Sequence, residues 1–139
     1  MELFNAMNIS ASGMKAQGVR MRVISENIAN SESTSNSPDV DPYRRKTISF
    51  KSELDRSKGI DKVAVDRIDR DDDTAFRLKF DPSHPAADES GYVKLPNVNS
   101  LIETMDMREA NRSYEANLSA IELSRGMLTR TIDMLRSTR

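Results

Sequence analysis

The 139-residue sequence has little or nothing of several residue types on which common functions depend. It contains no cysteine, which excludes disulfides, thiolate metal sites and cysteine nucleophiles. Its 21 basic and 22 acidic residues leave a formal charge of −1, so no positive excess is available to hold a nucleic acid or an anionic membrane. No run of about 18 apolar residues is present, and the first ten residues lack the pattern of a secretory signal peptide. The sequence therefore predicts neither a nucleic-acid-binding protein nor a membrane span.

Proline and methionine divide the chain into three parts. All five prolines lie between Pro38 and Pro96, and all eight methionines lie within residues 1–21 or 105–134. Because proline breaks helices, its absence from residues 1–37 and 97–139 allows a long helix at each end. We therefore predict an α+β fold with an N-terminal helix in residues 1–30, a linker and small β-rich region in 31–98, and a long C-terminal helix in 99–139.

The N-terminal helix carries a stripe in which large and small residues alternate at spacings of three and four. The large members, seven residues apart, are Met7, Met14, Met21 and Ile28. The small members between them, which would let a neighbouring helix approach closely, are Ala11, Gly18 and Ser25. We expect the helix to end near Asn27 and Asn30, because asparagine tolerates a left-handed C-cap.

The C-terminal helix is predicted to begin after an N-cap at Asn99 and to reach about Arg136, which makes it longer than the first. Its main stripe comprises Met107, Tyr114, Ile121, Leu128 and Leu135, flanked by Leu118 and Ile132. A second stripe comprises Ala116, Ala120, Leu123, Met127 and Met134. Packing against the N-terminal helix alone would leave the second stripe exposed, so the sequence predicts that both helices pack into a larger assembly.

The middle of the chain is predicted to form three short strands at residues 43–50, 62–68 and 75–80, because apolar and charged residues alternate there. We expect turns at 57–59 and 69–73. Three short strands would make one small sheet, which needs a covering helix or neighbour to be stable.

Two features of the middle region could carry chemistry. His84 lies between prolines and close to Asp81 and Asp88, but no nucleophile or pocket is specified, and we expect it to fix its loop. The carboxylates of 66–73 lack the spacing of a calcium loop and are interleaved with arginines. The sequence therefore predicts no catalytic, cofactor or metal site, and a protein that is not an enzyme.

Several phrases of the sequence resemble the bacterial flagellar rod and hook axial family, in particular its proximal rod members. They are Ser25–Asn30, Pro42–Arg45, His84–Pro85, Gly91–Val93, Pro96–Asn99 and Asp106–Asn117. The matching positions are Asn27, Asn30, Tyr43, Arg44, Arg45, His84, Pro85, Gly91, Tyr92, Pro96, Asn97, Asn99, Asp106, Tyr114 and Asn117. The resemblance runs essentially end to end, but residues 31–41 lack the glycine that the family usually has there.

The resemblance implies a structural subunit of the flagellar basal-body rod, the drive shaft that transmits torque to the hook and filament. It further implies that the terminal helices form a coiled-coil-like core, and that the chain reaches the periplasm-spanning rod through the flagellar type III export apparatus without a cleaved signal. The partners that it implies are the rod proteins FlgB, FlgF and FlgG, the adaptor FliE and further copies of the chain.

Two other classes of function remain open at this point. An adaptor or chaperone-like module of the flagellar export system would use the helices as a groove and would be a fully folded monomer or small oligomer. A small hydrolase would use His84 with Asp88. A rod subunit differs from both, because its isolated monomers are expected to leave much of the terminal helices disordered until assembly.

Overall fold

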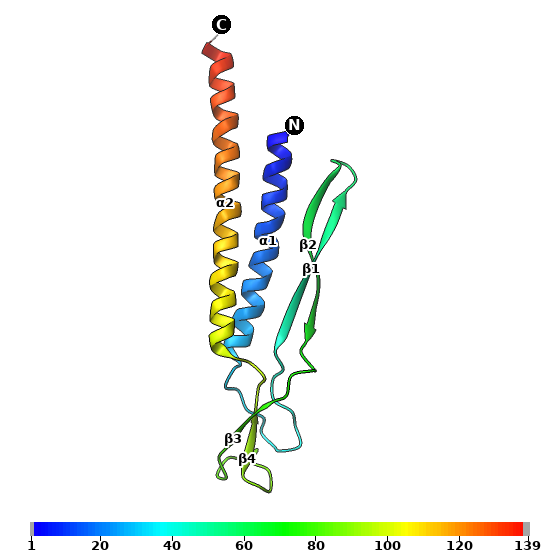
Figure 1. Cartoon of the computed structure of the whole chain (residues 1–139), viewed down its shortest axis with the longest axis vertical. Helices are drawn as coiled ribbons and strands as arrows, with labels where there is room; N and C mark the ends of the chain where they lie inside the picture. Colours follow the sequence, from blue (N-terminus) through cyan, green and yellow to red (C-terminus); the bar gives the residue numbers. More distant parts are fainter. Residues whose placement is uncertain (1, 138–139) are drawn as a thin grey trace. The chain divides into compact units, whose positions relative to one another are not determined.

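A computed structural model describes residues 2–137. In chain order it contains helix α1 (Glu2–Ala29), strands β1 (Lys46–Asp55), β2 (Ile60–Arg70), β3 (Arg77–Phe80) and β4 (Tyr92–Leu95), and helix α2 (Ser100–Ser137) (Figure 1). Two long terminal helices with a β-containing middle confirm the predicted α+β class.

Both helices fall close to the predicted bounds, but only one of the two predicted caps is correct. The Asn99 side-chain oxygen accepts from the backbone N–H of Leu101 at 3.0 Å, which confirms Asn99 as the N-cap of α2. The left-handed cap expected at the end of α1 is wrong. Among residues 2–137 only glycines have positive φ, and Asn30 instead donates its side-chain amide to the Glu26 carbonyl at 2.8 Å.

The strand prediction is wrong in two respects. The middle region forms two separate two-stranded sheets, β1–β2 and β3–β4, where one sheet was expected. The strand β4 was not predicted at all, because its four residues are too short for an alternation to stand out. The expected turn at 69–73 also begins late, since β2 continues to Arg70.

The chain separates into two compact units, which are described one at a time. Unit 1 comprises Met1–Arg20, Ser49–Asp66 and Glu109–Arg139, and unit 2 comprises Met21–Ile48 and Arg67–Arg108. Each helix therefore contributes one segment to each unit.

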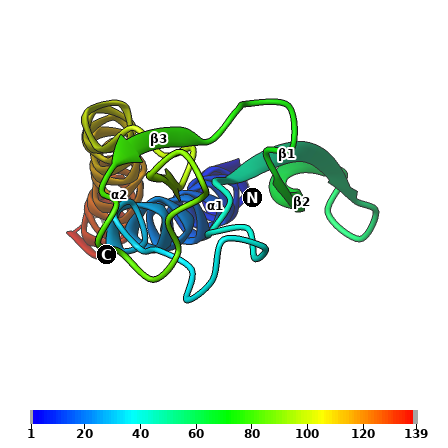
Figure 2. The ribbon, with the colours of Figure 1, turned by 90° about the horizontal axis from the view of Figure 1, so that it is seen from below.

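In unit 1 the segments of α1 and α2 lie side by side and antiparallel (Figures 1 and 2). Arg20 is 3.9 Å from Glu109, and a Cβ added to Gly13 would lie 2.9 Å from the side-chain amide of Asn117. The Val63 N–H of β2 donates to the Ser12 hydroxyl of α1 at 3.2 Å. Gly13 is therefore the glycine at which the two helices approach most closely within the unit.

In unit 2 a small apolar core forms around the end of α1 and strand β4. It comprises Val23, Ile24, Ala86, Val93, Leu95 and Val98. Strand β4 pairs antiparallel with β3, with Phe80 opposite Tyr92 and Lys79 opposite Val93. Alternate residues of β4 are buried, so one face of this sheet covers the core and the other is exposed.

Candidate functional site

The centre of unit 2 is a buried cluster of polar side chains drawn from several of the family phrases. We call it the polar cluster, and it comprises Asn27, Tyr43, Arg45, Lys46, Asn97 and Glu103. These residues lie in α1, in the segment leading into β1 and its first residue, in the segment before α2, and in the first turn of α2. Tertiary folding therefore joins phrases that are far apart in the sequence.

Asn27, only 1% exposed, uses all of its hydrogen-bonding capacity. Its side-chain oxygen accepts from the Tyr43 hydroxyl at 2.8 Å and from the Lys46 N–H at 2.9 Å. Its amide nitrogen donates to the Lys46 carbonyl at 2.9 Å and to Glu103 at 3.1 Å. Asn27 thereby bonds the end of α1 to the start of β1 and to the first turn of α2.

Glu103 is fully buried and its charge is matched. Its Oε1 accepts from Arg45 Nε at 2.6 Å, while Oε2 accepts from Asn27. Arg45 also lies 3.6 Å from Asp106. A buried carboxylate is tolerated only when it is paired and hydrogen-bonded, and both conditions hold here.

Asn97 completes the cluster from the segment before α2. Its oxygen accepts from the Arg45 N–H at 2.8 Å, and its amide donates to the carbonyls of Asp71 at 2.9 Å and Thr74 at 3.2 Å. Thr74 in turn donates to the Asp71 carboxylate, which holds the pKa of that carboxyl below its ordinary value. Asn97 thus fixes the loop between β2 and β3.

Two members at the edge of the polar cluster have shifted pKa values. Lys46 donates to the Glu26 carboxylate at 2.7 Å, which lowers the pKa of Glu26 and raises that of Lys46. Burial raises the pKa of the Tyr43 hydroxyl. These groups hold the segments together, and Tyr43 and Lys46 also line an open pocket of about 550 Å³ with Arg44, Arg70 and Asp72.

Arg44 and Gly91, also in the family phrases, have local structural roles. The Arg44 guanidinium lies 4.2 Å from the centre of the Phe76 ring and 3.5 Å from Asp72. Gly91 has a φ of 82°, and a Cβ there would lie 3.0 Å from Phe80. The turn between β3 and β4 therefore requires glycine.

His84 has a loop-fixing geometry. Its Nδ1 accepts from the Ala86 N–H at 3.1 Å, so the proton of the neutral ring is on Nε2, which lies 3.2 Å from the Thr34 hydroxyl. Asp81 bonds Ser83, and Asp88 bonds the backbone of Ser90 and Tyr92. Among residues 2–137 neither carboxylate bonds His84, so the structure gives no support to a hydrolase. Pro85, beside His84, is exposed.

The predicted assembly residues of α1 are not the ones most buried within the chain. Met7, Met14, Gly18, Met21 and Ile28 are half-buried and Ala11 is exposed, whereas the buried positions of α1 are Ala16, Val23, Ile24 and Asn27. A Cβ added to Gly18 would meet nothing within 4 Å. The predicted stripe is therefore partly covered by the chain itself, with Ala11 and Ser25 as its exposed members.

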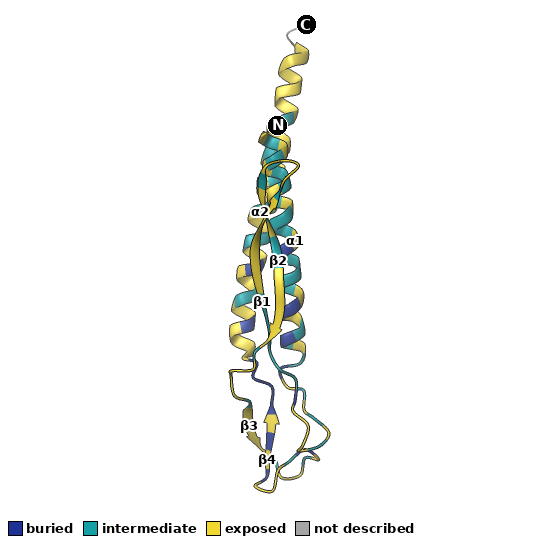
Figure 3. Cartoon of the chain, turned by 90° about the vertical axis from the view of Figure 1, so that its right-hand side faces the viewer, coloured by how far each residue is buried: buried dark blue, intermediate teal, exposed yellow. Residues whose placement is uncertain are grey.

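The predicted main stripe of α2 likewise contains both half-buried and exposed residues. Met107, Tyr114, Ile121 and Leu128 are half-buried, and Leu118, Ile132 and Leu135 are exposed. The residues of the second stripe are exposed, with Leu123 at 62% and Met134 at 63%. Figure 3 shows the last turns of α2 as an exposed segment.

Sequence reasoning missed Glu103, Lys46 and Gly13. Glu103 stands four residues before Met107, on the apolar stripe of α2, and a charge inside such a stripe could have indicated a buried acid. Lys46 and Gly13 left no such signal, because their roles depend on backbone groups and a helix contact that only the folded chain brings together.

Within residues 2–137 the structure shows no group of three or more side chains that could hold a metal ion. In that same range, no helix is both long and apolar enough to cross a membrane.

Family comparisons point to one group of proteins at both ends of the chain. Residues 7–36 match the family described as flagella basal body rod protein. Residues 89–134 match the family described as flagellar basal body rod FlgEFG protein C-terminal. The matched regions include α1 after its first turns, β4 and most of α2.

Individual relatives are similar over nearly the whole chain. The sequence is 51% identical to a flagellar basal-body rod protein FlgC of Agrobacterium fabrum, over 96% of this chain and 95% of the relative. It is 41% identical to the protein of the same name from Aquifex aeolicus, over 96% and 97%. The FlgC of Salmonella typhimurium is 32% identical over 96% and 98%.

Proposed function

Since the chain belongs to the FlgC family of flagellar basal-body rod proteins and is a structural subunit of that rod, we propose that its terminal helices form the core of the proximal rod. In this proposal residues 1–30 and 99–139 are the axial core, and residues 31–98 are a separate middle region outside it. The family resemblance supports the place of the helices in the rod core. The exposed apolar residues support contacts between these helices and their neighbours.

The observation that carries this proposal is the exposed second stripe of α2. Leu123, Met127 and Met134 stand 62%, 45% and 63% exposed on a helix of 38 residues, against 28 for α1. Exposed apolar residues in a helical row are typical of a surface that another protein covers. Neighbouring helices in the rod would cover them.

The residues that recur every seven positions in α1 and α2 form the rest of the proposed contact surface. Met7, Met14, Met21 and Ile28 would pack on helices of neighbouring subunits, as would the half-buried stripe from Met107 to Leu128 where it is not already covered. Torque would be transmitted through many such contacts, because close-packed side chains deform little.

We propose the rod proteins FlgB, FlgF and FlgG, the adaptor FliE and further copies of the chain as the neighbours. The chain would leave the cell interior through the flagellar type III export apparatus, without a cleaved signal peptide. Both parts of the proposal rest on membership of the family.

The test is complementation of an Agrobacterium fabrum strain that lacks its own FlgC. The native chain and the control Ser119→Arg should restore rods and swimming, whereas Leu123→Arg/Met127→Arg should not. Ser119 is exposed on the same helix, so both variants carry arginine on α2. Rods are counted in purified basal bodies by electron microscopy, and circular dichroism checks that the free variants match the native chain.

Two outcomes would overturn the proposal. One is full rod assembly with Leu123→Arg/Met127→Arg. The other is restored swimming with the native chain absent from purified basal bodies, which is what an adaptor of the export system would give.

A further inference from the structure

Strand β1 has a backbone edge that the chain leaves free. Within residues 2–137 its sheet has two strands, so β2 is its only neighbour there. The N–H and C=O of Lys46 both bond the Asn27 side chain, which shows that they point away from β2. Because alternate residues of a strand direct these groups to the same side, the outer edge of β1 continues through Ile48, Phe50, Ser52 and Leu54.

The outer edge is exposed and partly apolar. All of residues 49–54 are exposed, with Phe50 at 38% and Leu54 at 56%. Among residues 2–137 no other segment bonds the backbone groups of Phe50, Ser52 or Leu54. Such an edge is a template for pairing with another strand.

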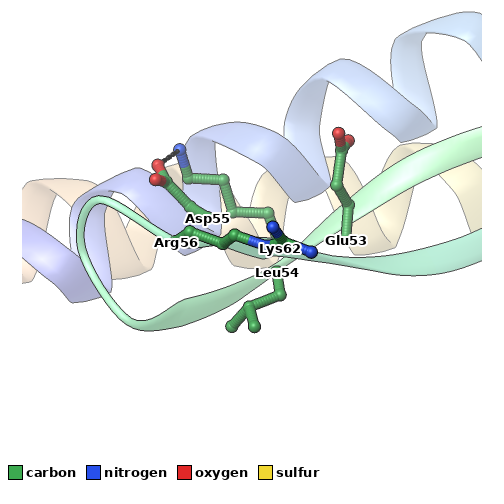
Figure 4. A pocket seen from close by; sticks show the side chains of 5 residues that line it. All are labelled: Glu53, Leu54, Asp55, Arg56 and Lys62. Carbon is green, nitrogen blue, oxygen red and sulfur yellow. Dashed lines mark hydrogen bonds and ion pairs between the residues drawn. The ribbon is translucent and has the colours of Figure 1, made fainter.

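The two faces of this edge carry different chemistry. Phe50, Ser52 and Leu54 share one face, and Lys51 and Glu53 share the other. Figure 4 shows Leu54 and Glu53 pointing to opposite sides of the strand. A partner strand must therefore match an apolar face and a charged face at the same time.

We propose that the outer edge of β1 pairs antiparallel with the same edge of a second copy of this chain, centred on Ser52. In this register Phe50 lies opposite Leu54 of the second copy, Lys51 lies opposite Glu53, and Ser52 lies opposite Ser52. Apolar residues thus meet apolar residues and opposite charges meet, which are the cross-strand pairs that stabilise a sheet. In two antiparallel copies of residues 50–54, each residue therefore lies opposite a residue of matching chemistry.

Neighbouring registers place unfavourable pairs of side chains opposite each other at these same residues. Centring the pair on Lys51 places two lysines opposite each other, and centring it on Glu53 places two glutamates opposite each other. A smaller shift, which places Lys51 opposite Ser52, pairs residues of opposite faces. Apolar side chains would then lie opposite charged ones. Of the registers centred on Lys51, Ser52 and Glu53, only the one centred on Ser52 satisfies both faces.

The charged groups at the tip of the hairpin are compatible with this pairing. Asp55 is already bonded by Lys62 at 2.6 Å and by the Ser57 hydroxyl, which lowers the pKa of its carboxyl (Figure 4). Glu53 has no bond to any other side chain in the described part of the chain, although it lines an open pocket of about 420 Å³ with Arg56. Lys51 lies 3.5 Å from Asp66, and its three N–H donors leave room for Glu53 as well.

This contact goes beyond the role in the rod. A two-fold contact uses the same surface on both copies and closes on itself, so it cannot propagate along a filament. It therefore belongs to the free subunit and not to the rod lattice.

The first test uses disulfide cross-linking, which is selective because the chain has no cysteine of its own. In the full chain, Ser52→Cys should form a covalent dimer under mild oxidation. Ser49→Cys is the matched control on the same strand, since the two copies of residue 49 would lie roughly 20 Å apart, beyond the reach of a disulfide. Equal cross-linking of both variants, or none by Ser52→Cys, would overturn the proposal.

The second test reverses the charges and measures dimerisation by sedimentation equilibrium. Lys51→Glu should weaken the dimer at least tenfold, and Lys51→Glu/Glu53→Lys should restore it to within about threefold of the native chain. Lys58→Glu, in the loop after β1, should have no effect. A double variant as weak as the single one would contradict the pairing.

Both tests are run with Leu123→Arg/Met127→Arg present, so that association through the helices does not contribute. The two proposals can then fail separately. Loss of the dimer leaves the rod assembly experiment unchanged, and loss of rod assembly in the helix variant leaves the cross-link of Ser52→Cys unchanged.

Discussion

Units 1 and 2 are similar in size but differ in what they bury. Unit 2 buries branched apolar side chains such as Val23, Val93 and Val98, together with the polar cluster. The buried apolar residues of unit 1 are Ala16 and Ala110. Larger apolar residues of unit 1, such as Met14 and Ile121, are only half-buried. Since burial of apolar surface contributes about 0.8 kcal/mol per CH₂, unit 1 gains less stabilisation in this way than unit 2.

The two units therefore differ in how far the chain's own contacts hold them together. In unit 2 the polar groups of Asn27 and Asn97 are all bonded within the chain. In unit 1 large apolar residues such as Leu123 and Met134 remain exposed. We infer that unit 2 is folded in the free subunit, and that the helical segments of unit 1 depend on the rod.

The largest expected effect is that of Glu103→Ala. It removes a buried carboxylate and the hydrogen bonds that this carboxylate accepts from Arg45 and Asn27, which should lower the free energy of unfolding by about 3 kcal/mol. Glu109→Ala, at an exposed ion pair with Arg20, should change it by less than about 0.5 kcal/mol. Urea denaturation followed by circular dichroism measures both, and equal losses would remove the distinction between the units.

Asn27→Ala should have the next largest effect. It leaves the Tyr43 hydroxyl and the N–H and C=O of Lys46 without this partner in a partly buried place, at a cost of about 2 kcal/mol. Asn30→Ala is the matched control from the same phrase, because its side chain makes one local bond to Glu26 and should lose no more than about 0.5 kcal/mol. The same denaturation experiment compares them, and an equal loss in Asn30→Ala would show that the cluster is not special.

Glycine substitutions should give opposite signs in the two units. Gly91→Ala should destabilise unit 2 by about 1.5 kcal/mol, because an alanine there is strained at a φ of 82° and would press on Phe80. Gly18→Ala, in α1 of unit 1, should favour the helical state of its segment by about 0.5 kcal/mol through helix propensity. A thermal melt of the free chain measures the first effect, and the helix content of the free chain by circular dichroism measures the second.

The Gly18 variant also sharpens the assembly prediction. If a neighbouring helix approaches closely at this residue, Gly18→Ala should reduce the number of rods in the complementation strain while favouring the helical state of its segment in the free subunit. Normal rod numbers would show that Gly18 is not a point of close contact.

The smallest expected effect is a dependence on pH. The pKa of Asp71 is lowered in the folded chain by the bond from Thr74, so its carboxylate contributes stability above its unfolded pKa, and this contribution is lost as the pH falls through the folded value. Asp71→Asn should therefore be less stable than the native chain at pH 6, and the difference should shrink below about pH 4. A constant difference across this range would contradict the assignment.

The helices could be predicted from the sequence because helical periodicity and proline absence are local signals. Asn99 as an N-cap, and the lengths of α1 and α2, follow from residues within one or two turns. The polar cluster could not be predicted, because Asn27, Arg45 and Glu103 are separated by up to 76 residues and their bonds exist only in the folded chain. The sequence analysis interpreted Asn27 only as a residue near the end of a helix, because its bonds to distant residues exist only in the folded chain.

The central claim is tested most directly by hydrogen exchange of the free subunit, diluted until light scattering shows a monomer. The account predicts strong protection of amides in 22–31 and 93–106, within unit 2, and fast exchange in 5–19 and 111–135, within unit 1. On adding a neighbouring rod protein, the second group should become protected. Strong protection of 5–19 and 111–135 in the dilute monomer would contradict the account, because unit 1 would then be stable without a partner.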